Sequence, residues 1–391
     1  MIDFDFISPT KIYFGKNKED ELSSILSSYN VKSLLLVYGT SSIKRIGLYD
    51  KVIKELNDAH IKFIELSGIK PNPSVERVYE GIKIAKENDV DFVLAIGGGS
   101  VIDTAKLIAD GFYYDGDPFD FNQYKVSPKN ALPVGIILTL AASGSELSQS
   151  CVITNEKLKI KAGFNSDFNR PRFAIMNPEL TYSVSKFQTG CGIVDIISHS
   201  LERYFCPSDE FDFSDDMALA IIKNIIKCGE TCINEPTNYN ARALMMLTGA
   251  YSHNGFTGLG KKTVMSIHGI EHALSGYKTD IAHGAGLSVL IPAWMSYVCS
   301  YDLKKFSKFS KVLFNLNYDD LEKNATMGIQ FLKDYFVKIG MPTTLKELGI
   351  NEDDIPLIAD LATKNGTRMI GTLSIRPLDK KDIINILKSV L

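Results

Sequence analysis

Cysteine and histidine are scarce in this chain. Its 391 residues include six of each, and no two cysteines form a Cys-x-x-Cys pair. Scattered cysteines are typical of a reduced protein, so we expect a cytoplasmic chain and exclude a disulfide scaffold. Cys228 and Cys232 lie four residues apart, which places them on one helix face and indicates packing.

Long apolar segments are also absent. The longest apolar runs, such as residues 92–96 and 287–294, are much shorter than the roughly 20 residues that a membrane-spanning helix needs. The first ten residues carry two aspartates and no basic residue, unlike a signal peptide. The net charge of −3 favours neither nucleic acid nor an anionic membrane as a partner. We therefore expect a soluble protein with no nucleic-acid or membrane partner.

The first half of the chain alternates between strand-like and helix-like patterns. Short apolar runs predict strands at residues 32–38, 63–66, 92–96 and 135–140. Helical spacing predicts helices at residues 43–60, 75–88 and 101–111, the second of them capped by Ser74. Apolar runs that alternate with helices are typical of a parallel sheet covered on both faces. The sequence therefore predicts an α/β domain with a Rossmann-like, mostly parallel sheet.

From about Ser185 onward the pattern is helical throughout. Examples are residues 215–233, 241–253, 263–275 and 321–339. Because a single core rarely extends beyond about 250–300 residues, two domains are expected. We predict a dinucleotide-binding α/β domain over residues 1–185, followed by an all-α, metal-binding domain over residues 186–391.

Two glycine-rich loops follow predicted strands. Gly97-Gly98-Gly99-Ser100 lies between a strand and a helix, where glycines allow the backbone and the exposed amides of the helix to approach a phosphate. The second loop, residues 139–146, follows the strand at residues 135–140. Either loop alone could be an ordinary turn. Together, at strand ends in an α/β sheet, they favour a dinucleotide site.

The segment after the first predicted strand bears on the choice of dinucleotide. NAD sites usually place an acid there to bind the ribose 2′-hydroxyl, and that acid repels a 2′-phosphate. No acid lies between Val37 and Tyr49, where Lys44 and Arg45 stand instead. The sequence therefore predicts that NADP(H) is preferred over NAD(H).

Most of the histidines are grouped. Asp195 and His199 have the i, i+4 spacing that places two side chains on one helix face, and His268 and His272 repeat it. His283 follows shortly afterwards. Each pair alone could be a hydrogen bond or a helix cap, but apolar neighbours surround them, and a buried Asp needs a partner or a metal. Three imidazoles and one carboxylate suit a transition ion better than calcium or magnesium. Spacing does not decide which three histidines are ligands, and His60 and His253 are expected to be structural.

These motifs together resemble the iron-containing (group III) alcohol dehydrogenase family, in its butanol dehydrogenase and NADPH-dependent aldehyde reductase branch. Residues 4–15 look like the opening hairpin of the family. Residues 68–73 and 91–106 match its cofactor signature, and residues 192–202 and 268–286 match its metal segments. The resemblance covers nearly the whole chain.

The resemblance implies a set of site residues. It assigns one Fe²⁺ or Zn²⁺ ion to Asp195, His199, His268 and His283, and it leaves His272 as a catalytic residue that is not a ligand. The cofactor-binding positions that we predict are Gly39, Ser41, Asn72, Gly97, Gly98, Gly99, Ser100, Asp103, Thr139, Leu140, Ser143, Lys161 and Leu180.

The expected reaction is hydride transfer between NADP(H) and a small, butanol-like primary alcohol or its aldehyde, in a homodimer. The metal would polarise the carbonyl oxygen, and His272 or water would supply the proton. One alternative is an NAD-dependent polyol dehydrogenase of the glycerol type in the same superfamily, and another is a relative of dehydroquinate synthase. A metallohydrolase or a non-catalytic metal-binding protein would leave the glycine loops unexplained.

Overall fold

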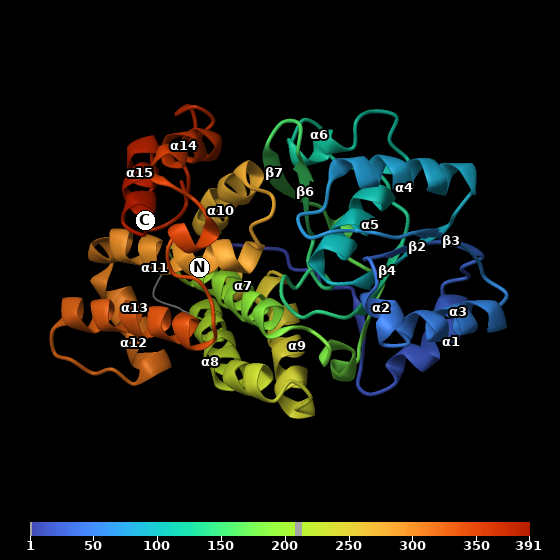
Figure 1. Ribbon diagram of the computed structural model, residues 1–391, viewed down its shortest axis with the longest axis horizontal. Coiled ribbons are helices and arrows are strands. Elements are labelled where there is room, and N and C mark those ends of the chain that lie inside the picture. Colours follow the sequence, from blue (N-terminus) through green and yellow to red (C-terminus); the bar gives the residue numbers. More distant parts are fainter. Residues whose placement is uncertain (1, 208–212) are drawn as a thin grey trace. The chain divides into compact units, whose positions relative to one another are not determined.

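The computed structural model describes residues 2–207 and 213–391 (Figure 1). The chain divides into two compact units. The sheet unit comprises residues 7–184 and 237–246, and the helical unit comprises the other described residues. Residues 2–6 and 237–246 are thus grouped differently from the predicted domains, whose boundary after residue 185 stays a prediction.

The sheet unit is built on six parallel strands in the order β1-β8-β5-β4-β2-β3. The strands are β1 (Lys11–Phe14), β2 (Ser33–Tyr38), β3 (Lys62–Leu66), β4 (Phe92–Gly97), β5 (Val134–Leu138) and β8 (Phe173–Met176). The predicted α/β domain with a parallel sheet is confirmed. The opening hairpin expected at residues 4–15 is wrong, because only β1 forms there and it pairs in parallel with β8. A separate antiparallel hairpin, β6 (Ser150–Asn155) and β7 (Ile160–Asn165), was not predicted.

Three helices of the sheet unit were predicted, one of them with a break that the sequence did not reveal, and α1 and α6 were not predicted. They are α1 (Leu22–Ser28), α2 (Ser42–Arg45), α3 (Leu48–Asp58), α4 (Val75–Glu87), α5 (Gly99–Gly111) and α6 (Phe119–Asn122). The helix predicted over residues 43–60 is split because Gly47 adopts a left-handed conformation with φ of 73°. Ser74 is the N-cap residue of α4, as predicted, although its side chain makes no capping hydrogen bond.

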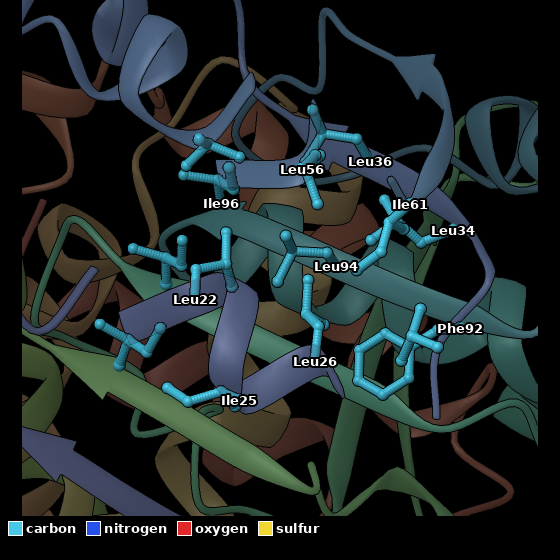
Figure 2. Packing of buried hydrophobic residues seen from close by; sticks show 14 of the residues in the cluster. Leu22, Ile25, Leu26, Leu34, Leu36, Leu56, Ile61, Phe92, Leu94 and Ile96 are labelled. Carbon is cyan, nitrogen blue, oxygen red and sulfur yellow. The ribbon is translucent and has the colours of Figure 1, made fainter. Parts of the chain in front are cut away.

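One face of the sheet packs on α1 and α3 (Figure 2). The alternate residues Leu34 and Leu36 of β2 and Phe92, Leu94 and Ile96 of β4 point to this side. On α1 and α3 they meet a row of buried side chains, namely Leu22, Ile25, Leu26, Val52 and Leu56. Because the other face of these strands is buried as well, the strands are apolar throughout, which is why the sequence revealed them.

Helix α5 is unusual because its buried side includes charged residues. The Lys106 ammonium is fully buried and donates to four oxygens, the carbonyls of Ser145, Ser148 and Ser150 and the Ser145 hydroxyl, at 2.8–3.0 Å. One turn earlier, Asp103 accepts hydrogen bonds from the Ser145 hydroxyl and the Val152 amide. Lys106 and Asp103 therefore attach α5 to the loop at residues 145–150 and to β6.

Asp110, on the same helix, gives a pH-dependent prediction. It is 1% exposed, and neither carboxylate oxygen has a hydrogen-bond partner among the described residues. Burial raises the pKa of Asp110 to about 8, although Lys106 opposes the rise. The folded state thus retains a proton that the unfolded state releases near pH 4, so this group costs stability as pH rises towards 8. An asparagine side chain cannot ionise, so Asp110→Asn is expected to raise the free energy of unfolding by roughly 1–3 kcal/mol at pH 9.

Urea unfolding of Asp110→Asn and wild type at pH 5 and pH 9 measures this effect. The gain in the free energy of unfolding should be smaller at pH 5, where Asp110 is protonated in the folded state. A gain of equal size at both pH values would show that ionisation of Asp110 is not the cause.

The helical unit contains helices of 9–22 residues. They are α7 (Lys186–Tyr204), α8 (Phe213–Asn234), α10 (Ser266–Tyr277), α11 (His283–Val298), α12 (Leu303–Phe314), α13 (Leu321–Lys338), α14 (Ile355–Thr363) and α15 (Lys380–Lys388), together with the second half of α9 (Tyr239–His253). Within the described ranges, no helix is both long and apolar enough to span a membrane.

Candidate metal centre and cofactor loops

The four predicted metal ligands come together in the helical unit. Helix α7 begins at the Ser185 cap, whose hydroxyl accepts from the Gln188 amide, and it carries Asp195 and His199 one turn apart. His268 lies in the first turn of α10, and His283 is the first residue of α11. Asp195 Oδ1 lies 3.6 Å from His199 Nδ1, 3.6 Å from His268 Nε2 and 3.6 Å from His283 Nε2.

Three of the donor atoms at this centre are buried without a hydrogen-bond partner among the described residues. They are Asp195 Oδ1, His199 Nδ1 and His268 Nε2. Leaving such atoms unpaired away from water costs about 1–3 kcal/mol each, so a group bound between them would stabilise the arrangement. One carboxylate oxygen with imidazole nitrogens is the donor set of a borderline ion such as Fe²⁺ or Zn²⁺. These residues therefore fit a divalent transition metal.

Glu202, which the sequence reasoning missed, fixes His268. It lies on α7 one turn beyond His199 and is buried. Its carboxylate accepts from His268 Nδ1, from the His268 amide at 3.2 Å and from the Ile267 amide at 2.6 Å. The last two bonds satisfy free amides at the start of α10, where the helix dipole favours an anion. One side chain thus positions both the helix and the imidazole.

Glu271 has the same role for His283. It is fully buried on α10, and its carboxylate contacts His283 Nδ1. A carboxylate behind a ligand histidine fixes the ring and the tautomer that faces the metal. Close packing of α11 on α7 brings His283 into place, because a Cβ atom at Gly284 would lie only 2.3 Å from the Cys191 carbonyl oxygen. The sequence signal for both glutamates was their spacing of three residues from a predicted ligand, at His199 and His268.

Burial lowers the pKa of an imidazole at this centre, whereas a nearby carboxylate raises it. Burial and the nearby rings of His253 and His268 hold the pKa of His199 well below its usual value. Burial would also lower the pKa of His268, but Glu202 and Asp195 outweigh it and raise that pKa to about 9. A proton on His268 must leave Nε2 before a metal can bind, so metal loading is coupled to proton release.

His272 is placed beside the centre. It lies on α10, half-buried, with its ring centroid 6.1 Å from that of His268 and 5.8 Å from that of His283. One ring nitrogen of His272 lies within 4.8 Å of a carboxylate oxygen of Glu271 and a ring nitrogen of His283. The division between His283 as ligand and His272 as proton carrier therefore stays a prediction.

His253 also lies at this centre, which the sequence did not reveal. It was expected to be structural and distant from the other histidines, but its ring centroid lies 3.9 Å from that of His199. The guanidinium of Arg203 contacts its Nδ1 at 3.0 Å. Among the six histidines, His60 lies in the sheet unit, at a turn with φ of 55°.

The predicted phosphate loop lies in the sheet unit at the start of α5. Gly98 precedes the helix in an extended conformation, and the second glycine loop packs directly on it. A Cβ atom at Gly99 would lie 2.4 Å from Ser143 Oγ, and one at Gly98 would lie 3.1 Å from Leu140 Cβ. The Thr139 amide donates to the Gly97 carbonyl. A side chain at Gly98 or Gly99 would force its neighbour to shift. The close approach groups the predicted positions Gly97, Gly98, Gly99, Ser100, Thr139, Leu140 and Ser143 at the ends of β4 and β5.

The remaining predicted cofactor positions are more dispersed. Gly39 and Ser41 follow β2, the strand next to β4, and Asn72 lies in a left-handed conformation in the loop before α4. Asp103 and Lys161 are buried, the first with both oxygens hydrogen-bonded to the chain and the second on β7. Leu180 packs on the core cluster of the α1 and α3 face. Their roles in cofactor binding stay predictions.

An acid does stand near the end of β2, although not on that strand. Glu65 of β3 accepts from the Tyr38 hydroxyl at 2.5 Å and from the Tyr49 hydroxyl at 2.9 Å. Burial and Glu65 raise the pKa of Tyr38 to about 12. The Lys44 ammonium lies 4.5 Å from the Tyr49 ring centroid. Since two tyrosines occupy both oxygens of Glu65, this acid is engaged within the chain.

Similarity to known protein families extends over both units of the chain. The family of iron-containing alcohol dehydrogenases matches residues 9–178, and the C-terminal family of Fe-containing alcohol dehydrogenases matches residues 189–391. NADH-dependent butanol dehydrogenase A of Clostridium acetobutylicum is 41% identical over 99% of both chains. NADPH-dependent aldehyde reductase YqhD of Escherichia coli is 29% identical over 95% of both chains.

Solved structures agree with the sequence matches. The crystal structure of NADH-dependent butanol dehydrogenase A from Thermotoga maritima superimposes with a TM-score of 0.95 and 37% identity, covering 100% of this chain and 99% of the other. The similarity in sequence and in fold therefore extends over nearly the whole chain.

Proposed function

We propose that this chain, which belongs to the iron-containing alcohol dehydrogenase family, reduces small aldehydes such as butanal to primary alcohols with NADPH. As a member of that family it is an alcohol dehydrogenase or aldehyde reductase, and so an oxidoreductase that uses a divalent metal, typically iron, and a nicotinamide cofactor. One observation supports the proposed centre above the others, namely that three imidazole nitrogens lie 3.6 Å from Asp195 Oδ1.

The proposed ligands are Asp195, His199, His268 and His283. When bound there, a divalent metal supplies a Lewis acid for a carbonyl oxygen, and the nicotinamide supplies the hydride. Glu202 and Glu271 orient two of the imidazoles, so these ligands are in place before the substrate arrives. We assign His272 to proton delivery, because it is half-buried beside His283 and an imidazole exchanges protons near neutral pH.

A homodimer is part of the proposal, and sedimentation of the purified protein tests it.

For the cofactor, we propose that NADP(H) is preferred. The support is that no acid lies between Val37 and Tyr49, and that the Glu65 carboxylate accepts hydrogen bonds from two tyrosines. NADH is the alternative, because relatives such as the Clostridium enzyme carry NADH in their names. For the metal, we propose Fe²⁺, with Zn²⁺ as the alternative that the same donors accept.

Kinetics with both cofactors test the proposal directly. Protein loaded with Fe²⁺ without oxygen is expected to oxidise NADPH in the presence of butanal, with kcat/KM at least about tenfold above that for NADH, which corresponds to about 1.4 kcal/mol. Gly39→Asp places an acid at the end of β2. Since a Cβ atom there meets only the Ile69 carbonyl, at 3.6 Å, the variant should fold and should reverse the preference.

The outcomes separate the parts of the proposal. Equal kcat/KM with NADH and NADPH would refute the cofactor preference and leave the dehydrogenase reaction intact. No nicotinamide oxidation with any of several small aldehydes would refute the proposed substrate class. Metal analysis of protein purified without oxygen distinguishes iron from zinc.

A further inference from the structure

Three imidazole rings are in contact in the helical unit, with His199 between the other two along the series. The ring of His199 lies 3.9 Å from that of His253 with an interplanar angle of 40°, and 4.6 Å from that of His268 with an angle of 20°, measured between centroids. Both rings therefore lie in contact with the imidazole of His199. His199 is a proposed ligand on α7, whereas His253 is the last residue of α9.

Arg203 fixes the orientation of His253. It lies one turn after His199 on α7 and is buried. One guanidinium nitrogen donates to the carbonyls of His199 and Ser252, each at 2.9 Å, and the other contacts His253 Nδ1 at 3.0 Å. A guanidinium has only donors, so Nδ1 of His253 accepts and the ring proton lies on Nε2.

The proposed ligand histidines thus have different supports. His268 is held by the Glu202 carboxylate and His283 by the Glu271 carboxylate. For His199, the described structure provides an aromatic face from His253 and backbone contacts from Arg203 instead. A ring that is in close contact with two others cannot rotate about its Cβ–Cγ bond without displacing them.

We propose that His253, held by Arg203, is a positioning residue that keeps the His199 ring in its metal-binding orientation. This inference rests on the proposed function, because it takes His199 as a ligand. Partners behind metal ligands typically change metal affinity by about 10–100-fold when removed. Loss of the His253 ring face should therefore weaken metal binding, mainly by faster release, although His253 itself is not a ligand.

A matched pair of variants isolates the ring face. His253→Leu and His253→Phe both remove the Nδ1 acceptor of Arg203 and both leave an apolar side chain, but only Phe retains a flat ring. Metal-free protein is titrated with Co²⁺, and the visible absorption of the bound ion gives the affinity and reports on ligand geometry. A chelator then gives the release rate.

The expected result is a Co²⁺ affinity about 10–100-fold weaker for His253→Leu, with faster release and an altered spectrum. His253→Phe should stay within about threefold of wild type. His60→Asn is the control, because His60 lies in the sheet unit and Asn tolerates its left-handed conformation. Its Co²⁺ affinity should not change.

The remaining outcomes either overturn or support the proposed role of His253. Wild-type affinity and release rate in His253→Leu would overturn the inference, and so would equal losses in the Leu and Phe variants. Thermal unfolding of the metal-free variants shows whether either is misfolded, and a folded Phe variant with wild-type affinity still supports the ring-face role if the Leu variant fails to fold. Failure of the wild-type protein to bind Co²⁺, Fe²⁺ or Zn²⁺ would instead refute the proposed metal site itself.

Discussion

Replacing His268 with alanine is expected to remove bound metal and turnover together. His268 Nε2 lies 3.6 Å from Asp195 Oδ1, and its other nitrogen is held by Glu202. The substitution removes one of four proposed donors and leaves the Glu202 carboxylate buried without its imidazole. Lewis-acid activation contributes several kcal/mol to such reactions, so kcat/KM should fall by roughly 10³-fold or more. Elemental analysis and NADPH oxidation on the same preparation measure both losses.

His272→Ala is the matched control, one turn away on α10. If His272 carries the proton, this variant should retain its metal and lose roughly 10²–10⁴-fold in kcat. Loss of metal from His272→Ala would show that His272 is a ligand, which the proximity of its nitrogen to Glu271 and His283 allows. Retention of stoichiometric metal by His268→Ala would refute the proposed ligand set.

Replacing Lys106 with methionine is expected to destabilise the protein strongly. The buried ammonium donates to four oxygens and compensates the carboxylate of Asp103. Methionine has a similar length but no donor, so three carbonyls and a hydroxyl lose their partner while Asp103 stays buried. Breaking a buried charge pair from one side costs about 3–5 kcal/mol. The urea midpoint should fall accordingly, and NADPH binding should weaken because the loop at residues 139–150 loses its anchor.

Lys83→Met provides the comparison for this prediction. Lys83 lies on the neighbouring helix α4 with its side chain 74% exposed, and its ammonium lies 3.9 Å from the Glu87 carboxylate. Such a surface change should stay within about 0.5 kcal/mol of wild type. If Lys106→Met unfolds at the same urea concentration as Lys83→Met, the four hydrogen bonds contribute no net stability.

The sequence revealed the parts of the fold that local pattern determines. The strands β2, β4 and β5 are apolar on both faces, and the helices α4 and α5 have clear spacing, so their positions were predictable. The strands β1 and β8 have only four residues each and pair with partners far away in the sequence, and the hairpin strands β6 and β7 are partly polar. The break at Gly47 was missed because its left-handed conformation interrupts a pattern that continues on both sides.

For the site, spacing identified the candidate pairs and the family resemblance chose the ligands among them, but neither revealed the residues behind them. Asp195 and His199 share a helix face, which sequence alone can show. Contact between His253 and His199 requires α9 to end beside α7, and no local signal encodes that packing. Glu202 and Arg203 are adjacent in the sequence yet serve different histidines, which becomes apparent only in three dimensions.

The meeting of α7, α10 and α11 at Asp195 Oδ1 has a consequence for how the protein withstands heat. An ion that joins side chains so far apart in the sequence acts as a reversible cross-link of the folded chain, and its binding free energy adds to the free energy of unfolding. By mass action, each tenfold rise in free metal above the dissociation constant adds about 1.4 kcal/mol. If the proposed ligands hold a metal, the melting temperature of this protein should therefore rise with the concentration of free metal around it.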